Sequence, residues 1–491
     1  MQKLNRSLLF TELNTVYSSG EDTPLDLKLD MLLPESTEAL FRVKPTEKGL
    51  LLRREFFTAI LSDRENTVAH FEKCLSLLAD ASEAYYALES AVCDNAKHCI
   101  FYEYARKMTE IYCVFAHDRK LGELYGGFSS YFADAVASAE FAELCAKLET
   151  VYKAKERIGA LDLNAEGEKI KISRDTPVSM REKLSLCLDA YGISLPEADR
   201  KRVLIQKGIV DAAAALYPAE FAEFAEFYRV YGDFFDRSVF GIATEFRLAI
   251  GIIRLVERAE RAGVPHCFPT LSQARKIKLY DVYDIALLLK EDVHIVPNDG
   301  VFTSDEPFFY LTGANGGGKT TYLRAMGNAV LMFLFGAPVF CRSGECCLLD
   351  GVHTHFPKDE RFEGSGRFAD EQKRVDMILS ACENAEGHGN SLILLNETYS
   401  TTNEEKATVC TSELARRLHS SGNFGLYITH QHGVDEAVVP FLGVLVDEQD
   451  RNRRTYRIER RRLKNRSFAA DILAKYGITA EELSELLRRG E

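Results

Sequence analysis

The sequence predicts a multidomain protein, with a mostly α-helical first half and an α/β domain behind it. Residues 46–176 contain no proline, which permits long helices. After Pro269, short apolar runs of strand length alternate with helical patterns to the end of the chain, as in a mostly parallel sheet. The 491 residues suffice for two to four units at about 100–200 residues per domain.

The composition is that of an ordinary soluble protein, with 46% hydrophobic and 27% charged residues. A formal net charge of −13 argues against whole-molecule affinity for nucleic acid or anionic membranes, but it leaves room for a local basic patch. The first twenty residues do not resemble a signal peptide, and the longest apolar run is too short to span a bilayer, so no membrane partner is expected. The twelve cysteines contain no C-x-x-C pair, and a cytoplasmic location is expected.

Residues 1–45 mix polar turns with short apolar pieces and are expected to form a lead-in segment. Residues 46–268 are predicted to form a helical domain, with helices over 132–157 and 219–261 among others. Period-two alternation in residues 161–164 and 169–172 predicts a small β-hairpin near 160–172. The aromatic residues of 219–261 are expected to lie in the core or between helices.

The α/β domain is assigned to residues 269–491. Strands are predicted at 308–311, 392–395, 424–429, 442–446 and 455–458, and helices at 320–334, 404–418, 467–476 and 480–489. Thr402 and Glu405 have the spacing of a capping box, which predicts Thr402 as the N-cap of the 404–418 helix.

Residues 313–320 fit the phosphate-binding pattern G-x-x-x-x-G-K-[ST], between a predicted strand and a predicted helix. Glycines allow the backbone N–H groups to turn toward phosphate oxygens, and the helix N-terminus adds its positive dipole end. Lys319 is expected to reach the β- and γ-phosphates of ATP, and Thr320 to bind Mg²⁺. The candidate nucleotide-binding residues are Gly313, Ala314, Asn315, Gly316, Gly317, Gly318, Lys319, Thr320 and Thr321.

Hydrolysis of ATP requires a carboxylate near the γ-phosphate and a second group on the metal side. The apolar strand 392–395 ends at Asn396 and Glu397. Glu397 is the candidate catalytic base, and Asn396 is a candidate Mg²⁺ ligand through water. His430 follows the next strand and is a candidate sensor of the γ-phosphate, because α/β sheets bind ligands at the carboxyl ends of their strands.

Two further patterns leave alternatives open. Ser400, Thr401 and Thr402 could bind a phosphate from a partner subunit at a helix N-terminus, or could simply begin a helix whose Glu404 and Glu405 oppose an anion. Cysteines 346 and 347 with histidines 353 and 355 could hold a metal, but adjacent cysteines in an apolar run more often pack as small hydrophobic residues.

These segments together resemble the MutS family of mismatch-repair ATPases. The resemblance is carried by LTGANGGGKTTYLRAMG (311–327), SLILLNETYSTTNEE (391–405), YITHQHGV (427–434), VPND (296–299) and the segment 455–479. It implies an ABC-like P-loop ATPase domain that pairs head to tail in a homodimer, with a closing helix–turn–helix that supports dimerisation. It also implies that Ser400, Thr401 and Thr402 complete the partner's site, and that the helical half forms core, lever and clamp.

Three departures from the family pattern affect these expectations. Asn396 stands where the family has Asp, and the family's glycine-rich stretch after Asp-Glu is replaced by residues 398–402. The helical pattern begins by about residue 50, which leaves no room for the mismatch-reading domain. The Phe-x-Glu pattern of that domain occurs at residues 10–12, 101–103, 221–223 and 224–226, so it has no specificity here and mismatch reading is not predicted.

The sequence therefore predicts a MutS-like dimeric ATPase that uses ATP and Mg²⁺ to gate helical arms on double-stranded or branched DNA. One alternative is an ATP-binding clamp or scaffold with little hydrolysis, and another is an ATPase that acts on a protein partner. Basic residues are concentrated at 451–466 and, more thinly, at 169–183. The first group is expected to pair with acidic groups of the same molecule, and the second to contact DNA phosphates.

Overall fold

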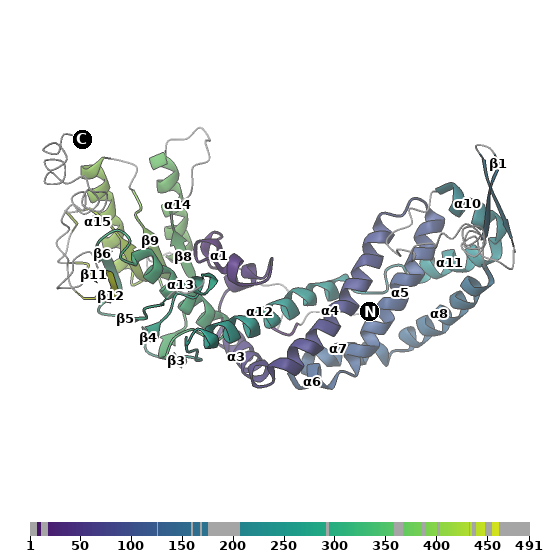
Figure 1. Ribbon diagram of the computed structural model, residues 1–491, viewed down its shortest axis with the longest axis horizontal. Coiled ribbons are helices and arrows are strands. Elements are labelled where there is room, and N and C mark those ends of the chain that lie inside the picture. The colour runs from purple at the N-terminus through teal and green to yellow at the C-terminus, as the bar shows by residue number, and fades with distance from the viewer. Residues whose placement is uncertain are drawn as a thin grey trace, which may run out of the picture. The chain divides into compact units, whose positions relative to one another are not determined.

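The computed structural model describes residues 7–10, 18–124, 126–158, 161–166, 169–174, 207–290, 294–357, 367–383, 389–399, 403–431, 433–434, 438–446 and 454–460. The chain forms two compact units (Figure 1). A helical unit comprises Met1–Leu8 and Ala69–Phe246, and an α/β unit comprises Leu9–Val68 and Arg247–Glu491. Each unit is therefore built from segments that are distant in the sequence.

The helical unit is packed around aromatic side chains. Its helices are α4 (Arg64–Glu89), α5 (Asp94–Ala116), α6 (Arg119–Leu124), α7 (Gly126–Val136), α8 (Ala139–Ile158), α10 (Lys207–Leu216), α11 (Pro218–Tyr231) and η2 (Arg237–Gly241), with the start of α12 (Ile242–Arg261). Phe101 and Phe227 are fully buried, and their ring centroids lie 5.4 Å apart across α5 and α11. The prediction that the aromatic residues form core is confirmed.

Two helices predicted as continuous are interrupted in the structure. The predicted helix over 219–261 consists of α11, η2 and α12, and Asp236 caps η2 by accepting a hydrogen bond from the Ser238 N–H at 3.0 Å. The predicted helix over 132–157 is divided between α7 and α8, where the Ser138 hydroxyl accepts from the Phe141 N–H at 3.2 Å. Periodicity missed both breaks, because a short polar side chain there replaces the helical hydrogen bonds of the backbone.

The predicted β-hairpin is confirmed. Strands β1 (Leu161–Glu166) and β2 (Lys169–Arg174) pair in antiparallel register, with Leu161 opposite Arg174 and Glu166 opposite Lys169.

A six-stranded sheet forms the centre of the α/β unit, in the order β12-β11-β6-β10-β9-β8 (Figure 1). Its strands are β6 (Phe308–Thr312), β8 (Val352–His355), β9 (Leu392–Asn396), β10 (Phe424–Ile428), β11 (Phe441–Val446) and β12 (Arg454–Glu459). Neighbouring strands are parallel except for the antiparallel pair β11 and β12. The central strands are apolar throughout because both faces of the sheet are covered.

Alternate residues of the central strands face two different helical layers. One layer is α13 (Lys319–Phe335), which contacts β8, β9 and β10. On the other face, α14 (Arg367–Cys382) and α15 (Glu404–Ser420) share one core with β6, β9 and β10. This core contains Tyr310, Leu395 and Tyr427, each almost completely buried.

A second, four-stranded sheet lies in the same unit, in the order β3-β7-β4-β5. Its strands are β3 (Thr270–Ser272), β4 (Lys276–Val282), β5 (Asn298–Thr303) and β7 (Ser343–Cys347), and η3 (Ile285–Leu289) follows β4. The side chain of Asn298 connects this sheet to β12, since its Nδ2 donates to Tyr456 O at 2.9 Å and its Oδ1 accepts from Ile458 N at 2.9 Å.

The segment expected as a lead-in forms α1 (Thr23–Asp26), α2 (Leu29–Leu32) and η1 (Glu38–Arg42), and α3 (Glu47–Ser62) follows. These elements belong to the α/β unit. The Thr23 hydroxyl donates to Val352 O of β8 at 3.1 Å, and Asn328 of α13 donates to Leu27 O at 3.1 Å. Within the described parts of the chain, no helix has the length and apolar character needed to cross a membrane.

Candidate functional site

The glycine-rich loop joins β6 to α13, as predicted. Gly313, Gly316 and Gly318 have φ values of 143°, 71° and 97°, which residues with a side chain rarely adopt. A Cβ on Gly317 would lie 2.9 Å from Ala314 O, so the loop is also too tight for a larger residue. Glycine is therefore required by conformation at three positions and by space at the fourth.

Lys319 begins α13 and turns back over the loop. Its Nζ donates to Gly313 O at 2.9 Å, to Ala314 O at 3.2 Å and to Asn315 Oδ1 at 3.3 Å. Burial lowers the pKa of Lys319, a lowering that the carboxylate of Glu397 opposes. The ammonium group thus lies among loop carbonyls with a carboxylate nearby, where an arriving anion would meet it.

Glu397 and His430 lie together at the carboxyl ends of neighbouring parallel strands. Ile428 of β10 is in register with Asn396 of β9, and the Glu397 N–H donates to Ile428 O at 3.0 Å. His430 Nε2 lies 3.1 Å from Glu397 Oε1. The hydrogen bond from His430 lowers the pKa of Glu397, and the positive charge of Lys319 adds to this effect. Glu397 is therefore held as a carboxylate facing the glycine-rich loop.

The backbone after β9 is strained at two residues. Glu397 has φ 53° and Tyr399 has φ 69°, left-handed values that cost a residue with a side chain about 1 kcal/mol or more. Tyr399 stands in the stretch where the MutS pattern has glycines, so the missing glycines coincide with real strain. The buried Tyr399 side chain belongs to the core shared by α14 and α15, which holds the loop in place.

Asn396, at the end of β9, is 8% exposed, and its Oδ1 has no hydrogen-bond partner among the described atoms. Thr320 lies one residue beyond Lys319 and is partly exposed. An unsatisfied amide oxygen and a hydroxyl suit Mg²⁺, which prefers oxygen ligands and keeps several of its waters. These residues therefore fit the predicted metal, which Asn396 would reach through water.

Sequence reasoning missed the contacts of three residues that fix the loop after Glu397. Thr398 Oγ1 lies 3.0 Å from His355 Nδ1, and the Thr398 carbonyl accepts from the Tyr427 hydroxyl at 3.0 Å. Each of the three is buried on or next to a strand of the sheet. Their contacts join β8, β9 and β10, which no local sequence pattern could reveal.

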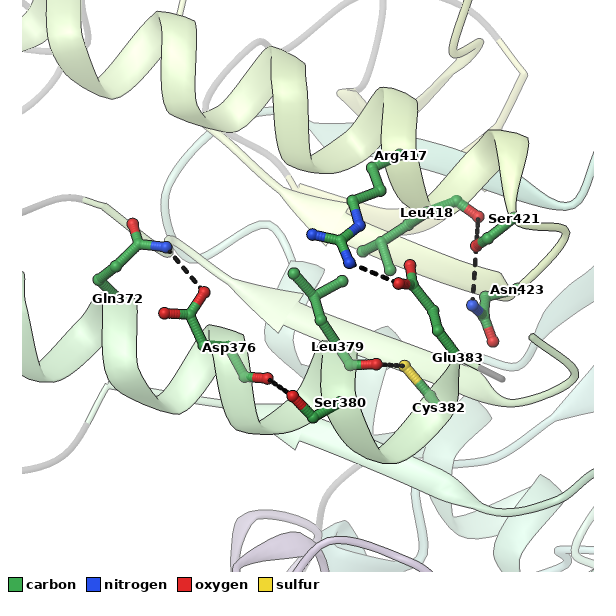
Figure 2. A network of polar contacts seen from close by, with 10 residues as sticks. All are labelled: Gln372, Asp376, Leu379, Ser380, Cys382, Glu383, Arg417, Leu418, Ser421 and Asn423. Atoms are coloured by element: carbon green, nitrogen blue, oxygen red, sulfur yellow. Dashed lines mark hydrogen bonds and ion pairs between the residues drawn. The ribbon is translucent and has the colours of Figure 1, made fainter. Parts of the chain in front are cut away.

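A polar network joins the ends of α14 and α15 and includes Asn423, the residue before β10 (Figure 2). Arg417 of α15 donates to the buried Glu383 carboxylate at 2.6 Å, just beyond α14. Asn423 donates to the Ser421 hydroxyl at 2.9 Å and accepts from the Ser391 N–H at 3.0 Å. The two strands that end in the candidate catalytic residues are therefore anchored at their beginnings too.

Several predicted features lie outside the described residues. These are Ser400, Thr401, Thr402, the helices at 467–476 and 480–489, and most of the basic group at 451–466. The N-cap of α15 is Asn403, whose side chain accepts from the Lys406 N–H at 2.9 Å, so the predicted Thr402 cap is wrong by one residue. Arg460 pairs with Glu306, in agreement with the expectation that the 451–466 group pairs with acids of the same molecule.

The described residues contain one cluster with metal-ligand spacing, formed by His70, Cys74 and Asp118. His70 Nε2 lies 2.8 Å from Asp118 Oδ2, and burial raises the pKa of Cys74 to about 12. A thiol that stays protonated is a poor metal ligand, so no metal is assigned to this cluster. The alternative site at cysteines 346 and 347 with histidines 353 and 355 is not such a cluster.

The fold and these strand ends define a multidomain protein that combines a helical unit with an α/β unit carrying a glycine-rich loop. Residues 309–465 match the family model of MutS domain V. Over these residues the chain is similar to the MutS family.

The chain is also similar to named mismatch repair proteins. The chain is 29% identical over 181 residues to DNA mismatch repair protein spellchecker 1 of Drosophila melanogaster, which covers 36% of this chain and 19% of that protein. It is 30% identical over 130 residues to the mitochondrial DNA mismatch repair protein MSH1 of Arabidopsis thaliana, a match that covers 26% of this chain and 11% of that protein. It is 29% identical over 181 residues to DNA mismatch repair protein MSH2 of Saccharomyces cerevisiae, a match that covers 36% of this chain and 18% of that protein. The match thus spans less than a fifth of each relative.

Proposed function

We propose that the chain is a MutS-like ATPase that binds ATP with Mg²⁺ at residues 313–321. The observation that carries the proposal is the meeting of three groups at one edge of the sheet. These are the glycine-rich loop with Lys319, the Glu397 carboxylate hydrogen-bonded to His430, and the buried oxygen of Asn396. Each supports a different requirement of phosphoryl transfer: holding phosphates, positioning water and offering an oxygen on the metal side.

In this proposal Lys319 exchanges its bonds to the loop carbonyls for bonds to the β- and γ-phosphates. Glu397 orients and deprotonates the attacking water, and its lowered pKa keeps the side chain ionised near neutral pH. His430 holds the Glu397 carboxylate in place and senses the γ-phosphate. Thr320, and through water Asn396, would hold Mg²⁺, which would supply positive charge to the phosphate oxygens.

An ATP-binding clamp with little hydrolysis is the second candidate, and Asn396 is the observation that favours it. An amide cannot give the metal side the negative charge that the family's Asp provides. The retained Glu397–His430 pair favours hydrolysis. Asn396→Asp separates the two candidates, because a large gain in turnover would identify the missing charge as the defect of a clamp.

We further propose a homodimer in which Ser400, Thr401 and Thr402 complete the partner's site, and helical arms that act on double-stranded or branched DNA. The names of the relatives, all DNA mismatch repair proteins, support a role in DNA repair. The basic residues of β2 and the segment after it are the candidate phosphate contacts. Their binding would be independent of sequence and would weaken with salt, with a slope of about −0.9 per phosphate neutralised.

The decisive experiment is equilibrium binding of a fluorescent ATP analogue to wild type and Lys319→Ala, followed by ATPase rates with and without duplex and branched DNA. Lys319→Ala is expected to abolish nucleotide binding while circular dichroism stays unchanged. Lys290→Ala serves as the matched control, because Lys290 is an exposed lysine of the same unit, at the C-terminal cap of η3. Wild-type affinity in a folded Lys319→Ala protein would reject the proposal. Loss of DNA binding in Lys169→Glu/Lys171→Glu tests the DNA part separately.

A further inference from the structure

Two cysteine thiols meet in the α/β unit, away from the glycine-rich loop. Cys267 lies between α12 and β3, and Cys341 lies between α13 and β7. The Cys267 N–H donates to Val339 O at 2.9 Å and the Val339 N–H donates to Cys267 O at 2.8 Å, so the two segments are held as an antiparallel bridge. The two Sγ atoms lie 3.4 Å apart, although 74 residues separate them in the chain.

The surroundings give the two thiols different roles. Cys267 is partly exposed, whereas Cys341 is completely buried. Arg54 is fixed beside Cys267, because its guanidinium donates to Phe268 O at 3.3 Å and Pro269 O at 3.2 Å. The hydrogen bond between the two thiols and the charge of Arg54 lower the pKa of Cys267, while the same hydrogen bond and burial raise the pKa of Cys341. A partly exposed thiol with a lowered pKa thus lies next to a buried thiol with a raised pKa.

We propose that Cys267 and Cys341 form a site of reversible oxidation, which reacts with a hydroperoxide and closes to a disulfide. The observations that carry the proposal are the 3.4 Å contact, the bridge that fixes it and the unequal exposure of the two sulfurs. A disulfide needs the sulfurs to approach to about 2.05 Å, a movement within reach of side-chain rotation. A low-pKa, accessible cysteine beside a resolving cysteine is the usual arrangement of such sites.

The reaction has two steps. The Cys267 thiolate attacks one oxygen of hydrogen peroxide, the O–O bond breaks, and Cys267 becomes a sulfenic acid while hydroxide leaves and takes a proton to form water. The Cys341 sulfur then attacks the Cys267 sulfur, the S–O bond breaks, and the thiol proton leaves with the hydroxyl group as a second water. Two thiols have lost two electrons in total, and the peroxide has gained them.

Other cysteines of the described chain lack this combination. Burial raises the pKa of Cys74 and Cys99 to about 12, which keeps both thiols protonated. Cys346 is close to the pair but is 1% exposed, and burial raises its pKa well above the usual value. Cys346 is therefore the competing resolving partner that an experiment must separate from Cys341.

The test uses the full chain, reduced with dithiothreitol, freed of it and exposed to a small molar excess of hydrogen peroxide. After acid quenching, free thiols are alkylated with N-ethylmaleimide and the protein is digested without reduction for mass spectrometry. The expected product is one linked pair of peptides containing Cys267 and Cys341, lighter than the two free peptides by two hydrogens. Dithiothreitol should separate the pair and restore alkylation at both positions.

Three variants sharpen the result. Cys267→Ser should abolish the link and leave Cys341 open to alkylation after unfolding. Cys341→Ala should leave Cys267 as a sulfenic acid that dimedone traps. Cys410→Ser, a partly exposed cysteine of α15, is the control and should form the link as the wild type does. The proposal is overturned if wild-type Cys267 stays alkylatable when Cys410 is oxidised, or if Cys267 links to Cys346 instead.

Discussion

Replacing Asn396 by Asp tests the candidate metal side of the site with almost no change of shape. Asn396 is 8% exposed, and its Oδ1 has no hydrogen-bond partner among the described atoms. In the nucleotide-free protein, the new carboxylate would be removed from water without gaining a donor. Burial disfavours the charged form, so the pKa of Asp at position 396 is expected to rise above its usual value of about 3.9.

The size of the stability loss in Asn396→Asp follows from the linkage between proton binding and folding. Each unit of pKa difference between the folded and unfolded states is worth about 1.4 kcal/mol at a pH above both values. A rise of about two units, modest for a site this buried, lowers the free energy of unfolding by about 3 kcal/mol at pH 7. Because the folded pKa is the higher one, the loss is absent below about pH 4, develops between about pH 4 and 6, and is complete at pH 7.

Urea denaturation of wild type and Asn396→Asp at pH 4 and pH 7 measures this loss, and adding Mg²⁺ with a non-hydrolysable ATP analogue should restore part of it. Asn328→Asp is the matched control. Asn328 is 2% exposed in α13, its Oδ1 also lacks a partner among the described atoms, and its Nδ2 donates to Leu27 O. Asn328→Asp should also lose stability, but Mg²⁺ with the ATP analogue should stabilise it no more than it stabilises the wild type. Equal losses at both pH values, or equal recovery in both variants, would refute the reasoning.

Three other variants test the site and its supports. Glu397→Gln should keep ATP affinity but slow phosphate release in a single-turnover assay by about two to four orders of magnitude, the usual contribution of a general base. A rate within tenfold of the wild type would exclude that role. Gly327→Ala should lower the free energy of unfolding measured in urea by about 1–3 kcal/mol, although alanine has the better helix propensity. The new Cβ would lie 2.5 Å from Leu27 Cδ2 and 2.7 Å from Leu394 Cδ1. A stabilised variant would disprove this packing. Asn403→Ala should cost about 1 kcal/mol in the same assay by uncapping α15, and an unchanged midpoint would contradict the cap.

The strands of the α/β unit and the glycine-rich loop could be predicted because their signals are local. An apolar run such as 392–395 is buried on both faces, and the glycines at 313, 316 and 318 satisfy backbone angles that few residues adopt. The position of His430 beside Glu397 could also be anticipated, since neighbouring parallel strands end at one edge. The left-handed backbone of Glu397 and Tyr399 could not, because tertiary packing imposes it against local preference.

The contacts of the first sixty residues could not be predicted from the sequence for a similar reason. Leu27 and Arg53 bind carbonyl and amide groups of α13, some three hundred residues away, and no periodicity encodes a partner at that distance. Helix breaks at Asp236 and Ser138 were missed because a single side-chain hydrogen bond outweighs an otherwise continuous apolar pattern.

The discontinuous make-up of the α/β unit sets the order of events during synthesis. Arg53 of α3 donates from its Nε to Phe335 O at 2.5 Å, and Phe57 is completely buried in the same region. A ribosome that adds about 5–20 residues per second needs about 12–50 s to travel from residue 68 to α13. Throughout that interval α3 has been made but its binding surface has not. The nascent chain therefore carries an unmatched apolar helix while the whole helical unit is being translated, a period in which chaperones and aggregation compete for it.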